Sequence, residues 1–163
     1  MLRIICAGLA CPLAQTLALS TMNTSDFCAR LNSIVPSDDG LHLQALNELT
    51  DDSAELVTHP EIASAVFAFL EQNGTADLGS PGPLVHFLER AFPSYVEALI
   101  ASLDRQPVSY TLWMANRILN AQIPQQLRVK LLSALGRAAQ HPLCAEIDRH
   151  QAHEFIERHA AEG

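Results

Sequence analysis

The stretch that decides the fold class is residues 94–140, SYVEALIASLDRQPVSYTLWMANRILNAQIPQQLRVKLLSALGRAAQ. Its apolar residues recur every three or four positions, which is the spacing of one face of a helix. Each apolar series begins after Ser94, Ser109 or Pro124, residue types that open helices. The predicted helices cover residues 94–105, 109–121 and 124–140.

The same spacing continues towards both ends of the chain. Further helices are expected over about residues 25–34, 41–49, 60–74, 80–91 and 143–160, with a short one over 51–57. No run shows the alternation of apolar and polar residues that is typical of a half-buried strand. The sequence therefore predicts an all-α fold.

Short links between these helices restrict how they pack. Helices joined by two to four residues lie antiparallel to their neighbours, and repeating units of about 40 residues are typical of HEAT solenoids. We therefore expect antiparallel helix pairs stacked as a HEAT-like right-handed solenoid. An irregular helical bundle is the alternative.

Residues 22–163 are expected to form a single helical domain, because 48% apolar and 17% charged residues are typical of a globular chain. Residues 1–21 are an apolar N-terminal extension, interpreted as a mis-assigned start because Met22 precedes the first helix directly. A weak signal peptide is the alternative. The expected compartment is the cytoplasm, or the periplasm if residues 1–21 are a signal peptide.

Charge is distributed unevenly. Residues 22–80, here called the acidic segment, contain ten acidic side chains and one basic side chain, Arg30. Residues 81–163, the balanced segment, contain eight of each. The acids of the first set are Asp26, Asp38, Asp39, Glu48, Asp51, Asp52, Glu55, Glu61, Glu71 and Asp77.

Such a negative field repels nucleic acid and anionic lipid and attracts cationic proteins, such as nucleases. We therefore expect a basic protein partner, no nucleic acid and no membrane. Beyond residue 25, polar residues or prolines interrupt every apolar run before it reaches the roughly 20 residues that a membrane helix needs. An acidic surface that serves solubility alone is the alternative interpretation.

The motifs of common enzymes are missing. The chain has no GxGxxG or GxxxxGK phosphate loop and no CxxC pair, and neither Cys28 nor Cys144 stands beside a base. Both cysteines are expected to be core thiols. We expect a protein that is not an enzyme and that needs no cofactor.

One metal site is the exception to consider. His150 and His153 are three residues apart on a predicted helix, and Glu146, Glu154 or Glu157 could complete a ligand shell. The order differs from that of HExxH zinc enzymes. A surface pair between Glu154 and Arg158, four residues apart, explains this helix more simply. A metal-assisted hydrolase is therefore the least favoured alternative.

The helix around Trp113 carries a polar and aromatic face. On a helical wheel Trp113, Asn116, Arg117 and Asn120 fall within an arc of about 100°. This face either meets a partner or lies between helical units, with its side chains bonded to neighbouring helices. The second interpretation is favoured because a lone tryptophan on such a helix is typical of a central, buried helix.

Two segments carry a resemblance to a known family. GSPGPLVHFLE (79–89) and WMANRILN (113–120), with Tyr95 and the LDRQP turn at 103–107 between them, resemble the core pattern of all-helical immunity proteins. These proteins belong to bacterial polymorphic-toxin and contact-dependent growth inhibition systems, and the resemblance covers about residues 78–140. The shared positions look like scaffold: Pro81, Gly82, His86, Glu89, Trp113, Asn116, Arg117 and Asn120.

The resemblance implies a protein that is made beside a toxin and neutralises it by tight binding, by occlusion rather than by catalysis. The acidic segment is then the expected surface for a basic, nuclease-like toxin. Within it, five acids lie in or beside turns: Asp38, Asp39, Asp51, Asp52 and Glu55. A helical-repeat adaptor or scaffold that binds a protein or peptide is the alternative function.

Overall fold

A computed structural model describes residues 22–161, and within them the regular secondary structure is helical. The prediction of an all-α fold is confirmed, and the described residues contain no strand. The elements are α1 (Thr24–Ser33), α2 (Leu41–Asp52), the 3-10 turn η1 (Ala54–Leu56), α3 (Pro60–Gln72), α4 (Pro83–Glu89), α5 (Val96–Arg105), α6 (Ser109–Leu119), α7 (Gln125–Ala139) and α8 (Glu146–Ala160). The expectations for residues 1–21 lie outside the described part of the chain.

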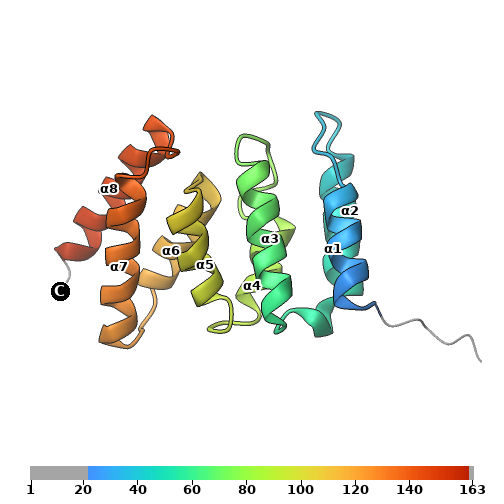
Figure 1. Cartoon of the computed structure of the whole chain (residues 1–163), viewed down its shortest axis with the longest axis horizontal. Coiled ribbons are helices and arrows are strands. Elements are labelled where there is room, and N and C mark those ends of the chain that lie inside the picture. The colour runs from blue at the N-terminus through green and yellow to red at the C-terminus, as the bar shows by residue number, and fades with distance from the viewer. Residues whose placement is uncertain (1–21, 162–163) are drawn as a thin grey trace, which may run out of the picture.

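The helices form two rows, and within each row they follow one another along the long axis of the molecule (Figure 1). In one row α1 packs against α3, α3 against α5, and α5 against α7. In the other row α2 packs against α4, and α6 packs against α8. The HEAT-like right-handed solenoid and its alternative, an irregular helical bundle, both stay predictions.

Helix starts differ in detail from those expected. Helix α1 begins at Thr24 and Asn23 caps it, because the Asn23 Oδ1 accepts a hydrogen bond of 2.9 Å from the backbone N–H of Asp26. Helix α4 begins at Pro83 instead of at Ser80, two residues after the cis peptide bond between Ser80 and Pro81.

The serines expected to cap later helices bond elsewhere. The Ser94 hydroxyl donates to the carbonyl of Ala91 at 2.6 Å, and α5 begins only at Val96. The Ser109 hydroxyl donates to Asp148 of α8, so it links two helices. Serine is therefore a good marker of these helix starts but a poor guide to the bond it makes.

The predicted apolar faces form the core. Ile62, Val66, Phe67 and Leu70 of α3 are all buried, as are Val96, Leu99, Ile100 and Leu103 of α5. Phe27 of α1 and Phe87 of α4 stack with ring centroids 5.6 Å apart, which joins the two rows. Burying each such side chain stabilises the fold by about 1.5–3 kcal/mol relative to exposing it.

A buried carboxylate joins α3 to α5. Glu71 accepts hydrogen bonds from the Ser102 hydroxyl at 2.5 Å and from Arg105 Nη2 at 2.7 Å and Nε at 3.1 Å. This fork satisfies the charge of a carboxylate that is 9% exposed.

Among residues 22–161, no helix is both long enough and apolar enough to cross a bilayer.

Candidate binding face

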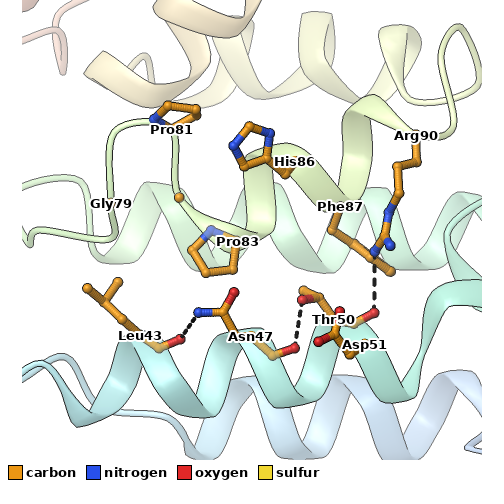
Figure 2. Close-up of a pocket in the computed structure, with 11 residues that line it drawn as sticks. Leu43, Asn47, Thr50, Asp51, Gly79, Pro81, Pro83, His86, Phe87 and Arg90 are labelled. Atoms are coloured by element: carbon orange, nitrogen blue, oxygen red, sulfur yellow. Dashed lines mark hydrogen bonds between the residues drawn. The ribbon is translucent and has the colours of Figure 1, made fainter.

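Three hollows lie along α2, α4 and α6, and the central and aromatic hollows meet at the loop before α4. The central hollow, of about 510 Å³, lies between α2 and α4 (Figure 2). The aromatic hollow, of about 520 Å³, lies between residues 74–81, α6 and α8. The acidic hollow, of about 360 Å³, lies between residues 36–43 and 75–77.

The loop at this junction needs its glycines. Gly79 has φ +89°, a left-handed conformation that other residues rarely adopt. A Cβ on Gly82 would lie 1.7 Å from the carbonyl oxygen of Leu78. The GSPGP segment therefore has a local structural reason, which supports the expectation that Pro81 and Gly82 belong to the scaffold.

The central hollow is lined by the C-terminal half of α2. The Thr50 hydroxyl donates to Asn47 O, and Arg90 Nη2 donates to Thr50 O at 3.4 Å (Figure 2). The Arg90 guanidinium also lies 5.3 Å from the centre of the Phe87 ring. Arg90 is therefore held at the end of α2, and Asp51 beside it is exposed with no basic partner among the described residues.

The aromatic hollow is walled by Tyr110 and Trp113. The Tyr110 hydroxyl donates to Ala76 O at 2.9 Å and accepts from the Leu78 N–H at 2.7 Å, so its ring is fixed to the loop. Burial raises the pKa of Tyr110. Of the described residues that line this hollow, none is charged.

The acidic hollow contains Asp38 and Asp77. His42, which is buried, donates from Nε2 to Asp77 O at 2.7 Å, and its Nδ1 accepts from the Ser37 N–H at 3.2 Å. The imidazole therefore fixes the loop and is not free for a ligand. No Lys or Arg is among the described residues of this lining.

The motif of α4 and α6 forms an ion-paired cluster. Arg117 makes two hydrogen bonds to the Glu89 carboxylate, of which Nη2 to Oε2 measures 3.0 Å. Its guanidinium lies 4.7 Å from the centre of the Trp113 ring, and His86 Nδ1 lies 3.5 Å from Glu89 Oε2. Burial, and then the charge of Glu89, raises the pKa of Tyr95 to about 12.

The remaining motif residues behave differently from one another. Asn116 is buried, and its Oδ1 lies 2.9 Å from Nε2 of the buried His159 in α8. Asn120 is exposed at the end of α6. On this face of α6, Arg117 bonds to α4 and Asn116 to α8, whereas Trp113 is half-buried and lines a hollow.

The five acids expected to bind a partner are not brought together. Asp38 and Asp39 precede α2, whereas Asp51, Asp52 and Glu55 lie at its far end, about 18 Å away along a helix of 12 residues. Asp39 accepts from the Ser37 hydroxyl and the Leu41 N–H, and these bonds lower its pKa. Asp52 pairs with Arg30 at 3.1 Å.

Several residues of this face were not expected from the sequence. Arg90, Phe87, Asn47, Tyr110 and Asp77 line the hollows or fix their walls. Arg90 and Phe87 lie in or directly after the 79–89 segment, which was a usable signal. The sequence contains no comparable signal for Tyr110, because its role depends on a hydrogen bond to Ala76 O, which is 34 positions away.

The alternative metal site finds little support. His150 Nε2 lies 3.3 Å from Glu154 Oε1, and Arg158 lies over the Phe155 ring, so the expected pair between Glu154 and Arg158 is wrong. Within residues 22–161, no group of three or more metal-binding side chains comes together.

The two described cysteines are free thiols. Cys144 is buried, as expected of a core thiol, whereas Cys28 is only partly buried. Burial raises the pKa of both thiols, which favours the less reactive protonated form. Neither Cys28 nor Cys144 is therefore activated as a nucleophile.

Comparison with protein families, with curated proteins and with solved structures finds no match to this chain.

Proposed function

We propose that this chain is an immunity-type inhibitor that binds a basic protein toxin and neutralises it by occlusion, without catalysis. The observation that carries the proposal is a set of exposed carboxylates with no basic partner among the described residues. They lie in the acidic segment and are Asp38, Asp51, Glu55 and Glu61. The resemblance of residues 79–89 and 113–120 to immunity proteins supports the same proposal.

The position of Asp51 adds a physical argument. Asp51 and Asp52 occupy the last turn of α2, which contains no basic residue. A helix C-terminus carries a partial negative charge, so acids there are unfavourable by about 0.3–1 kcal/mol each. A cationic partner would relieve this repulsion and would be steered towards it over a distance of about 8 Å at physiological salt.

The test is a charge reversal in the intact chain. The toxin candidate is the product encoded directly upstream, and its binding and the rescue of growth are measured with the Asp51→Lys/Asp52→Lys double variant. We expect binding at least about ten-fold weaker, and a difference that shrinks as salt rises. Both acids are exposed, so folding should be retained.

The matched control is Glu154→Lys/Glu157→Lys in α8, which changes the net charge equally and also involves exposed residues. It should weaken binding much less. Equal loss in both variants would reduce the effect to net charge, and unchanged binding in both would remove Asp51 and Asp52 from the interface. An upstream product that is neither bound nor toxic would contradict the function itself.

A helical-repeat adaptor is the second candidate, and the row of hollows on α2, α4 and α6 favours it. An adaptor would bind several partners, and its gene would have no toxin gene beside it. An inhibitor would bind one partner tightly. Quantitative affinity purification from the native cell separates the two functions.

A further inference from the structure

The three hollows adjoin one another through shared lining residues and are together called the groove. Leu43 lines both the acidic and the central hollow. Gly79 and Pro81 line both the central and the aromatic hollow. These shared positions lie on α2 and on the loop before α4, so the hollows adjoin one another across three elements.

Charge changes along this groove. The acidic hollow contains Asp38 and Asp77 with no Lys or Arg, and the central hollow contains one carboxylate, Asp51, and one guanidinium, Arg90. The aromatic hollow has uncharged walls in the described part of the chain. Its complement is therefore a ligand that is cationic at one end and uncharged at the other.

The length of the groove fits an extended peptide. Packed helices are about 8–10 Å apart, and α4 lies between α2 and α6, packed against α2 and ion-paired to α6, so α2 and α6 are separated by about 20 Å or more. An extended chain covers about 3.3–3.6 Å per residue and spans this distance with about six residues. A second copy of the chain is disfavoured as the occupant because its formal charge of −8 repels the acidic end.

We propose that this groove binds an extended segment of the basic protein partner, with a Lys or Arg side chain in the acidic hollow and an aromatic or aliphatic side chain against Trp113. This rests on the proposed function in one respect, that the partner is a basic protein. The fixed Tyr110 ring and the glycine-dependent loop provide a wall that does not need to reorganise on binding.

The test uses the full chain and a displayed library of random peptides about twelve residues long, encoded without tryptophan, which is long enough to span the groove. Selected peptides should share a basic residue and a large apolar residue separated by about four to seven positions. The chain has a single tryptophan, Trp113, so its fluorescence reports occupancy of the aromatic hollow without any substitution. Emission should change saturably with added peptide.

Two variants separate the ends of the groove. Asp38→Lys should weaken a selected peptide about ten-fold but keep the full emission change at saturation. Trp113→Leu should weaken it to a similar extent, with circular dichroism confirming that the helices persist. Glu157→Lys in α8 is the control and should leave affinity unchanged, because Glu157 lies outside the linings of the three hollows.

Opposite outcomes are distinguishable. No enrichment over the unselected library, or peptides that bind without changing Trp113 emission, would overturn the groove while leaving toxin neutralisation intact. Enriched peptides that behave as expected, together with an upstream product that is not neutralised, would support the groove and contradict the proposed function.

Discussion

The acidic and balanced segments use their charges in different ways. In the balanced segment acids and bases pair across helices: Lys130 with Glu97 and Arg137 with Asp104 join α7 to α5, and Arg117 with Glu89 joins α6 to α4. In the acidic segment most carboxylates face solvent without a base. Two pairs are exceptions, Arg30 with Asp52 and Arg105 with Glu71.

This difference separates two tasks. Exposed ion pairs add about 0–1 kcal/mol each and fix how neighbouring helices sit, which suits a scaffold. Carboxylates without a base create a long-range field, which suits recognition. The substitutions below test this division, beginning with the largest expected effect.

Gly82 lies where the two segments join. Gly82→Ala should lower the free energy of unfolding by about 3 kcal/mol, because its Cβ would collide with the Leu78 carbonyl. Gly136→Ala in α7, where no atom lies within 4 Å of the added Cβ, is the control and should raise it by about 0.5–1 kcal/mol. Urea denaturation measures both. Equal stability of the two variants would mean that this loop does not hold the segments together.

Glu71 is the acid of the acidic segment that performs a scaffold task. Glu71→Ala should lower the free energy of unfolding by about 2 kcal/mol, because it leaves the buried Ser102 hydroxyl without its partner. This loss of unfolding free energy is smaller than that expected for a fully buried ion pair, because the Arg105 side chain is half exposed and remains solvated. Glu71→Gln keeps an acceptor for the Ser102 hydroxyl, so its midpoint of thermal unfolding should fall less than that of Glu71→Ala. If Glu71→Ala lowered the free energy of unfolding no more than the loss of an exposed carboxylate does, the division between scaffold and recognition charges would be contradicted.

One substitution at two positions compares the segments directly. Asp104→Asn should lower the free energy of unfolding by about 0.5 kcal/mol, because it breaks contacts of 2.8 and 2.9 Å to Arg137. Asp51→Asn should raise it by about 0.3–1 kcal/mol, because it removes a negative charge from a helix C-terminus. In about 1 M salt both differences should shrink. Effects of the same sign at low salt would contradict the contrast.

The last effect, which appears only at alkaline pH, concerns Tyr95 in the balanced segment. Its pKa is raised from 10 to about 12, so the native state holds the phenol proton more tightly than the unfolded chain. The resulting stabilisation is complete below pH 10 and is lost as pH rises through about 12. Ultraviolet titration of tyrosinate should show this, and Glu89→Gln should lower the Tyr95 pKa. A measured Tyr95 pKa near 10 would mean that the phenol is exposed to water and would contradict its burial.

Periodicity was sufficient to predict the helices, because each face buries residues at local spacing. The stripes of α3 and α5 are buried as expected. Helix starts were harder, since a serine hydroxyl bonds either to a local acceptor, as Ser94 does to Ala91 O, or to a distant one, as Ser109 does to Asp148. The sequence predicted that this face of α6 bonds to neighbouring helices. It did not predict that Arg117 pairs with Glu89, which is 28 positions away.

The binding face was predicted only in part. Charge counts identified Asp38 and Asp51, and both line hollows. Composition does not reveal which acids are neutralised by contacts distant in sequence, as Asp52 is by Arg30, or which act as local hydrogen-bond acceptors, as Asp39 does. The groove itself depends on how three elements meet, and no local pattern encodes that.

The two-row arrangement also determines where the fold opens first. Helix α5 packs against α3, α6 and α7, whereas α2 at one end has its main contacts with α1 and α4. In a fold built from neighbour contacts, local unfolding is easiest at the ends, so amide hydrogens of α2 should exchange with solvent sooner than those of α5. A partner held by α2 would slow that exchange, and the order in which amides become protected would record its footprint.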